Sequence, residues 1–330
     1  MMDVEISAYV ILTVIFCLCL FVIYLDLKSI VLLISRFRHQ RKKADLSSPG
    51  RDERRPPKKS KLDRILAKAA FCLTVLGAVS YVYGYYIAPH HLTVTKISLP
   101  ISRIAVRSPL KIAHISDLHF EKSLKLHGQI LEELKKFAPD MILLTGDYVN
   151  EDRAEDSFRK FSSALSALAP VYAVDGNWDS EDMNRRVFSR TGVRYLEDEL
   201  ERIEIRGTPI SLVGITAFGT HSWKKIVPDI STDTLNIMLT HSPDMIPDVA
   251  SSGKVDFYFC GHTHGGQVRL PFYGALITLC DTGKRYEMGL YREGGMIAYT
   301  NRGVGMEGGA APRIRFLSPP ELALFTISRD

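Results

Sequence analysis

The 330-residue chain contains only five cysteines, and no two of them form a Cys-x-x-Cys pair. This absence excludes a zinc knuckle of paired cysteines and gives no indication of a disulfide framework. Cys17, Cys19 and Cys72 fall in apolar stretches, Cys260 ends an apolar run and Cys280 stands alone. We expect all five to be core thiols. No internal repeat is evident, and the length allows one large domain with attachments.

The chain also lacks an evenly basic character. The formal net charge is +5, but residues 36–68 alone hold thirteen Lys and Arg against four Asp and Glu. That segment carries +9, so the rest of the chain sums to −4. Because the basic excess lies in one segment, the composition indicates no nucleic-acid partner.

Two stretches lack charged residues altogether, at residues 6–25 and 69–88. Twenty helical residues cross a hydrocarbon core of about 30 Å. The second stretch ends in four tyrosines, which are typical of a membrane–water boundary. The first lacks the basic start and cleavage site of a signal peptide. We predict membrane segments within residues 1–35 and at residues 69–88, spanning or deeply inserted; a buried core helix is the alternative for the second.

Residues 36–68, between these stretches, predict a disordered basic linker rich in Ser, Pro and Gly. A loop this basic is expected to stay in the cytoplasm. If both segments span, residues 89–330 lie outside the cytoplasm, whereas a first segment lying in the interface leaves them inside. The linker either contacts anionic lipid head groups or remains solvated. The sequence therefore does not decide on which side of the membrane residues 89–330 lie.

From about residue 110 the pattern alternates between short apolar runs and helical periodicity, which predicts an α/β domain over residues 89–330. The apolar runs that predict strands are 111–115, 141–144, 171–174, 236–239 and 257–260. A polar motif follows each run directly, and sites in open α/β sheets form beyond the carboxyl ends of strands. Residues 210–215, 296–300 and 322–327 predict strands of a second sheet packed on the first.

As candidate ligands, the polar motifs together supply the carboxylates of Asp117 and Asp147, one amide and four histidines. They are Asp117-Leu118-His119, Gly146-Asp147, Asn177-Trp178-Asp179, His241 and Gly261-His262-Thr263-His264. Taken singly, each motif more often has a role other than metal binding. An Asp-x-His is commonly a surface pair, a Gly-Asp is commonly a turn, and an asparagine can be a helix cap. Their joint occurrence predicts a site for two divalent metal ions. A mixture of carboxylate and imidazole ligands suits Mn²⁺, Fe²⁺ or Zn²⁺ better than Ca²⁺ or Mg²⁺. Such a pair can deliver hydroxide to phosphorus, so we expect a phosphoester hydrolase.

At these residues the chain resembles the calcineurin-like metallophosphoesterase family, over about residues 110–327. The resemblance implies a four-layer αββα sandwich of two mixed sheets. The ligand set that it implies is Asp117, His119 and His264 for one ion, Asn177, His241 and His262 for the other, and Asp147 between them. Asp117, His119, Asp147 and Asn177 are the expected catalytic group, and Mn²⁺ is the first choice of metal, with Fe or Zn as alternatives.

Two further motifs, Gly265-Gly266-Gln267-Val268 and Asn301-Arg302-Gly303, resemble the membrane-associated bacterial branch of the family. That branch includes the pyrophosphatase of lipid A synthesis, which cleaves UDP-2,3-diacylglucosamine to UMP and the acyl-sugar phosphate. The resemblance implies a location at the bacterial cell membrane, the lipid bilayer as partner and a phosphorylated lipid or nucleotide-lipid as substrate. A broad phosphomonoesterase or phosphodiesterase is the alternative; the complete ligand set opposes a non-catalytic membrane scaffold.

Trp178 departs from the family, which usually has histidine there to protonate a leaving group. An indole cannot shuttle protons at neutral pH, so the leaving group must be good by itself, as in a pyrophosphate. Alternatively, Trp178 only packs, and His119 or a bound water serves as the acid. Trp178, Trp223 and Arg302 are the candidate substrate contacts; either tryptophan could stack on a base or lie at a lipid interface.

Overall fold

The computed structural model describes residues 61–101, 108–121, 126–217, 219, 221–307 and 313–329, together with residues 13, 17, 21–28, 30 and 31. The chain divides into two compact units, residues 5–83 and, from Gly84 onward, the catalytic unit. Most of the predicted first membrane segment and residues 36–60 of the predicted linker lie outside the described residues.

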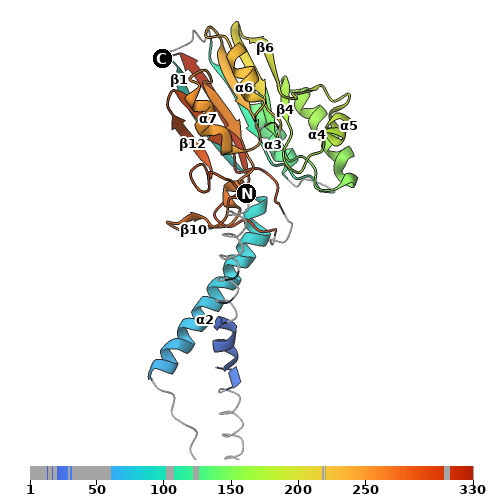
Figure 1. The fold of residues 1–330 in the computed structure, drawn as a ribbon. Helices are drawn as coiled ribbons and strands as arrows, with labels where there is room; N and C mark the ends of the chain where they lie inside the picture. The colour runs from blue at the N-terminus through green and yellow to red at the C-terminus, as the bar shows by residue number, and fades with distance from the viewer. Residues whose placement is uncertain are drawn as a thin grey trace, which may run out of the picture. The chain divides into compact units, whose positions relative to one another are not determined.

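The catalytic unit contains two six-stranded sheets (Figure 1). The first sheet consists, in spatial order, of β1 (Thr93–Ile101), β14 (Glu321–Arg329), β2 (Leu110–Ile115), β3 (Met141–Thr145), β4 (Val171–Val174) and β5 (Val193–Tyr195). The second consists of β12 (Gly289–Glu293), β13 (Met296–Thr300), β9 (Phe257–Cys260), β8 (Leu235–Leu239), β7 (Thr208–Gly214) and β6 (Glu199–Ile205). A small hairpin of β10 (Arg269–Leu270) and β11 (Gly274–Ala275) completes the described strands.

Parallel pairing in the middle of each sheet brings the ends of several strands to one edge. Strands β2, β3, β4 and β5 are mutually parallel, as are β7, β8, β9 and β13. Antiparallel pairs, β14 with β2, β12 with β13 and β6 with β7, make both sheets mixed. The prediction of two mixed sheets in an α/β fold is therefore confirmed.

Alternating side chains divide the apolar residues into three layers of core. In β2, Leu110 and Ile112 face the cluster between the sheets, whereas Ala113 and Ile115 face the outer cluster of the first sheet. That outer cluster is covered by α3 (His127–Phe137), α4 (Glu155–Ser166) and α5 (Glu181–Phe188). The outer face of the second sheet packs against α6 (Trp223–Ile226) and α7 (Ile246–Ser251). Figure 1 shows helices on both sides of the paired sheets.

The prediction that residues 322–327 belong to the second sheet is wrong. Strand β14 lies in the first sheet, between β1 and β2, with Phe325 opposite Ile112. Its side chains are buried on both faces: Leu324 packs under the helices and Phe325 packs between the sheets. A strand apolar on both faces needs an interior position with helices outside it, but the sequence does not specify which sheet offers one.

Helix α2 (Lys61–Val82) forms most of the described part of the other unit. The predicted linker therefore ends too late, since residues 61–68 are helical; Leu62, Ile65 and Leu66 extend the apolar character into them. Within the described residues, only the stretch 64–90 has the length and composition to cross a membrane, and an 18-residue segment of it has a mean hydropathy of 1.9. Only 6% of its apolar window is buried, which disagrees with the core-helix alternative.

The cysteines follow the same division. Cys260 and Cys280 are buried in the catalytic unit, as expected of core thiols. Cys17 and Cys72 are exposed, so the expectation of core thiols is wrong for these two. Cys72 lies in α2, most of whose large apolar side chains are exposed, so its apolar surroundings in the sequence do not form a protein core.

Candidate metal centre

The loops that follow β2, β3, β8 and β9 meet at one edge of the paired sheets. The backbone N–H of Asp117 donates to Gly146 O at 3.0 Å, which joins the loops after β2 and β3. The Gly261 N–H donates to His241 O at 2.9 Å, which joins the loops after β9 and β8. The His262 N–H donates to both oxygens of Asp117, at 3.1 and 3.2 Å, and so links the two sheets.

Five of the seven expected ligands have a left-handed backbone. Their φ angles are 48° at Asp117, 42° at His119, 57° at Asp147, 70° at His262 and 50° at His264. Positive φ is uncommon outside glycine, and such strained residues concentrate at active sites and ligand clamps. The backbone conformation therefore points to the same residues as their side-chain chemistry.

Glycines allow these loops to approach closely. A Cβ atom on Gly261 would lie 2.2 Å from Asp117 Oδ2, and one on Gly176 would lie 2.1 Å from Asp147 Oδ1. Both distances are far below van der Waals contact, so any larger residue would displace a candidate ligand. Glycine is needed at these positions for close approach to a side chain.

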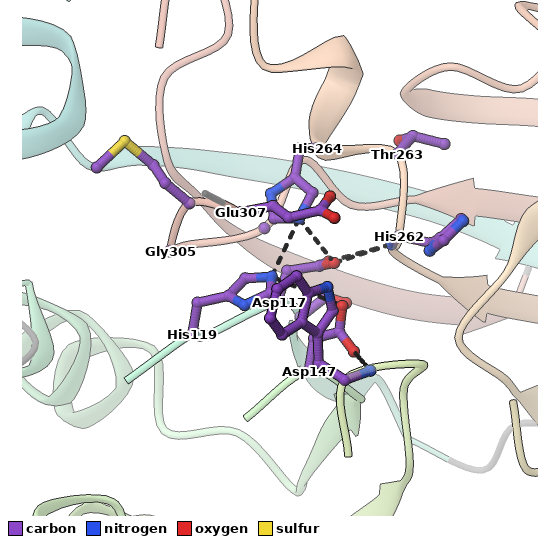
Figure 2. Close-up of polar contacts among 12 residues, drawn as sticks. Asp117, His119, Asp147, His262, Thr263, His264, Gly305 and Glu307 are labelled. Atoms are coloured by element: carbon purple, nitrogen blue, oxygen red, sulfur yellow. Dashed lines mark hydrogen bonds and ion pairs between the residues drawn. The ribbon is translucent and has the colours of Figure 1, made fainter. Parts of the chain in front are cut away.

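Asp117, His119, Asp147 and His264 are buried together, and one ligand atom from each lies within 4.8 Å of all the others. Figure 2 shows these side chains pointing toward a common centre. His264 Nε2 lies 3.4 Å from Asp117 Oδ1 and 3.2 Å from His119 Nε2. His119 Nε2 lies 3.6 Å from Asp147 Oδ2. Two carboxylates and two imidazoles so arranged are a donor set suited to a transition-metal ion.

Hydrogen bonds at the far side of three rings fix which nitrogen faces inward. His119 Nδ1–H donates to Asn150 Oδ1 at 2.7 Å, and His241 Nδ1–H donates to Thr145 O at 2.7 Å. A neutral imidazole that donates through Nδ1 carries its lone pair on Nε2. His262 is reversed, since its Nε2–H donates to Leu279 O at 3.3 Å and leaves Nδ1 as the acceptor. The inward lone pairs fit a cation.

The remaining ligands of the expected second ion are less enclosed. His241 Nε2 lies 3.2 Å from Asp147 Oδ2 and 3.1 Å from His262 Nδ1. His262 is partly exposed, and Asn177 is exposed on the loop after β4. The neighbouring Trp178 N–H donates to Asp147 Oδ1 at 2.9 Å, which holds this loop beside the shared carboxylate.

Burial and mutual charge perturb the carboxylates and histidines strongly. Burial raises the pKa of Asp117 to about 7. Burial acts in the same direction on Asp147, but His241 and its hydrogen bond outweigh it and hold the pKa of Asp147 below its ordinary value. Burial would lower the pKa of His241, whereas the charge of Asp147 raises it to about 10. Metal binding would require a neutral His241 ring, because only then does Nε2 offer a lone pair to the ion.

Asp179 organises the site without being an expected ligand. Its buried carboxylate accepts hydrogen bonds from the backbone N–H groups of Asp147, Tyr148 and Gly176, at 2.8, 2.9 and 2.8 Å. Burial raises its pKa to about 7. The motif Asn177-Trp178-Asp179 includes it, but the sequence gives no reason to assign it this role, because Asp147 and Tyr148 lie on a different loop, the one after β3.

Glu307 is a second carboxyl group that the sequence did not indicate. A hydrogen bond joins its side chain to Trp178, and burial raises its pKa, with the charge of Asp147 acting in the same direction. Trp178 is 41% exposed, and its ring meets the His119 ring edge to face at 5.9 Å between centroids. No motif surrounds Glu307, so only the folded chain identifies it.

The structure separates the three expected substrate contacts. Trp178 is exposed beside the His119 ring, which we call the open side of the cluster. Trp223 is buried in the core outside the second sheet, so its large apolar ring has a packing role there and the expected substrate contact is not supported. Arg302 is paired with Glu321 at 3.0 Å, and its side chain is only 13% exposed. Its guanidinium is therefore already neutralised by a carboxylate.

Comparison with known proteins agrees with this geometry. Residues 110–266 match the family model described as calcineurin-like phosphoesterase. The chain is 32% identical to the uncharacterized metallophosphoesterase YkoQ of Bacillus subtilis strain 168, covering 68% of this chain and 86% of that protein. It is 30% identical to the phosphodiesterase YaeI of Escherichia coli strain K12, covering 72% and 90%.

A further relative is the UDP-2,3-diacylglucosamine pyrophosphatase LpxG of Chlamydia trachomatis serovar D, which is 28% identical over 76% of this chain and 94% of its own length. The five loops, the buried Asp and His cluster and these relatives agree. The chain belongs to the calcineurin-like phosphoesterase family and is a metal-dependent hydrolase of phosphoester bonds.

Proposed function

We propose that this protein is a membrane-attached di-metal hydrolase that cleaves a phosphoanhydride in a lipid-linked substrate. The buried cluster of Asp117, His119, Asp147 and His264 is the observation that carries the proposal. Asp117, His119 and His264 would hold one divalent ion, Asn177, His241 and His262 would hold the other, and Asp147 would serve both. Two bound ions would activate a water molecule and neutralise phosphate oxygens. Mn²⁺ is the first choice, ahead of Fe and Zn.

The surrounding residues orient these side chains and shape the opening. Asn150 and Thr145 hold the rings of His119 and His241 in their donating tautomers. Asp179 fixes the loop that carries Asp147. Trp178, exposed beside His119, offers a flat apolar surface where the leaving group of the substrate would lie.

UDP-2,3-diacylglucosamine, cleaved to UMP and 2,3-diacylglucosamine 1-phosphate, is the proposed substrate. Similarity to the chlamydial pyrophosphatase supports this choice. So does Trp178, because a phosphate leaving group released from a pyrophosphate needs no proton, and an indole cannot give one. The apolar stretch 64–90 suits a substrate that carries acyl chains.

The proposed organisation places residues 1–35 and 69–88 in the cell membrane of a bacterium and residues 89–330 in the catalytic domain. The apolar, little-buried stretch 64–90 supports the second segment. A reporter fused after Asp330 would establish the side of the membrane. Because nucleotide sugars are cytoplasmic, a reporter that is active only outside the cytoplasm would contradict this substrate.

A phosphodiesterase or phosphomonoesterase of broad specificity is the second candidate. Glu307 favours it, since a carboxyl group with a raised pKa beside Trp178 could protonate an alkoxide leaving group. Similarity to the phosphodiesterase of Escherichia coli also favours it.

The test is an activity screen of the detergent-solubilised full chain with Mn²⁺. We expect kcat/KM for UDP-2,3-diacylglucosamine to exceed that for chromogenic phosphate monoesters and diesters. Faster turnover of the monoester would contradict the leaving-group argument and favour the second candidate. Asp147→Ala is the inactive control, and metal analysis with near-zero occupancy of the unmodified chain would instead favour a non-catalytic scaffold.

A further inference from the structure

A short hairpin of the catalytic unit exposes a cluster of apolar side chains to solvent. It consists of β10, β11 and the residues around them, and we call residues 268–279 the apolar hairpin. Phe272 at its tip is 111% exposed, more than in an extended reference peptide. Leu270, Tyr273 and Leu279 are 45%, 55% and 46% exposed. Clustered exposed apolar residues mark a surface that contacts a partner.

The backbone conformation at the tip of the hairpin is also unfavourable for an aromatic residue. Phe272 has a φ of 65°, in the left-handed region that glycine and asparagine adopt most readily. A bulky aromatic residue in this conformation is strained. Because Phe272 is exposed to solvent, no burial of its ring offsets the strain. Strain of this kind in a structure points to a function at that position.

The hairpin is connected to the point where the apolar helix enters the catalytic unit. Arg269 N–H donates to Phe316 O at 3.0 Å, and the adjacent Arg315 N–H donates to Gly84 O at 2.9 Å. Gly84 belongs to the catalytic unit and lies in the turn of π-helix Tyr83–Ile87 that follows α2. One segment of chain therefore joins the base of the hairpin to the end of the membrane-compatible stretch.

The groups around these two sites are those found at membrane–water boundaries. Tyr85 and Tyr86, in the same π-helix, are 46% and 62% exposed. Lys284 Nζ lies 3.4 Å from the centre of the Tyr273 ring and donates to Tyr273 O. Tyrosine and lysine side chains place an apolar body in the bilayer and a polar tip at the head groups.

We propose that the apolar hairpin inserts into the interfacial region of the phospholipid bilayer that holds α2. Its other end reaches the metal centre, because Leu279 O accepts a hydrogen bond from His262 at 3.3 Å. Insertion would therefore hold the candidate ligands at the level of lipid phosphates. This role rests on the proposed membrane attachment and lipid-linked substrate, and it names the surface that delivers that substrate.

Bilayer contact can be measured by tryptophan quenching in the full chain, reconstituted into phosphatidylethanolamine–phosphatidylglycerol vesicles with brominated acyl chains. Phe272→Trp is compared with Leu76→Trp in α2 and with Ser163→Trp, an exposed position on α4, which lies away from β10 in Figure 1. The unmodified chain supplies the background of Trp178 and Trp223. We expect quenching at positions 76 and 272 and none at 163.

The outcomes separate the two proposals. Quenching at position 76 without quenching at 272 would overturn hairpin insertion and leave membrane attachment intact. Absence of quenching at both positions would contradict the attachment itself and the hairpin proposal with it. A hairpin that is unquenched but forms chain-to-chain cross-links at position 272 would show that a second copy of the chain is its partner, which also overturns the proposal.

Delivery of substrate is tested with Phe272→Asp against Phe272→Leu, which keeps an apolar side chain. Loss of one buried aromatic anchor predicts about a tenfold fall in turnover of vesicle-borne substrate for the Asp variant. Turnover of a soluble chromogenic diester should be unchanged, and the Leu variant should retain most activity on both. Equal turnover of vesicle-borne substrate by the Asp and Leu variants would contradict delivery by the hairpin, whatever the identity of the substrate.

Discussion

The two halves of the candidate metal centre differ in how completely the fold encloses them. Asp117, His119 and His264, the first half-site, are all buried. The second half-site is Asn177, His241 and His262; there only His241 is buried, and Asn177 is exposed. Asp147 lies between them. The first half-site is therefore formed by the packing of the two sheets, whereas the second depends on loops that reach the surface.

This difference predicts unequal metal affinity. A set of donors already held in place needs little reorganisation on binding, so the first half-site should bind its ion more tightly. The second half-site is also the one in contact with the apolar hairpin, through His262 and Leu279. Metal occupancy of the second half-site should therefore respond more than that of the first to changes in the apolar hairpin.

Asp147→Ala should have the largest effect, because the two half-sites share this carboxylate. We expect turnover to fall by about a thousandfold or more, with loss of both ions by elemental analysis. Asp248→Asn, an exposed carboxylate on α7, is the matched control. Retention of two ions by Asp147→Ala would contradict a shared carboxylate, since each half-site would then bind its ion independently of Asp147.

Paired histidine variants sharpen the comparison. His262→Ala should lose the weaker ion only, whereas His264→Ala should lose the tighter one, with affinity lowered about 100-fold or more at the altered half-site. Metal titration followed by thermal unfolding measures both, because a bound ion raises the midpoint according to its affinity. Equal affinities for the single ion that each variant retains would show that burial does not rank the half-sites.

Asp179→Ala should weaken both half-sites less severely. Its carboxylate holds the Asp147 and Tyr148 backbone, so its loss should lower metal affinity about 10-fold to 100-fold without removing a ligand. Asp179→Asn retains one acceptor oxygen, so its metal affinity should lie between those of Asp179→Ala and the unmodified chain. Circular dichroism must show the native fold, and unaltered metal affinity in the Ala variant would exclude this positioning role.

Trp178→His should have the smallest effect and act on the open side. We expect kcat for a phosphate monoester to rise a few-fold, up to about 10-fold, because a histidine can protonate an alkoxide leaving group. The pyrophosphate substrate should gain nothing. Glu307→Gln in the Trp178 background tests the other donor: a selective loss of monoester turnover would assign the proton to that carboxyl group.

Much of this architecture could be predicted because the local pattern decides it. The runs before Asp117, Asp147 and His262 are buried strands, so their apolar character is visible in the sequence. The seven expected ligands stand out because their residue types share one chemistry. The roles of these side chains as ligands remain a prediction.

The rest depends on tertiary contacts that local pattern does not contain. Residues 322–327 are visibly a strand, yet only packing on both faces places them in the first sheet. Trp223 fills a core that the sequence does not reveal. Glu307 and Trp178 are 129 positions apart in the sequence and meet only in the folded chain, so no spacing rule could pair them.

The position of β14 bears on how the protein is made. Within the described residues, β1 pairs only with β14, and the hydrogen-bonded Thr95 and Glu321 are 226 positions apart. Contacts this distant in the sequence slow folding, because a long loop must close before they form. A ribosome must therefore synthesise the segment Glu321–Arg329 before β2, the strand that precedes Asp117, has both neighbours. Until then the nascent domain exposes an unpaired strand edge, which invites aggregation.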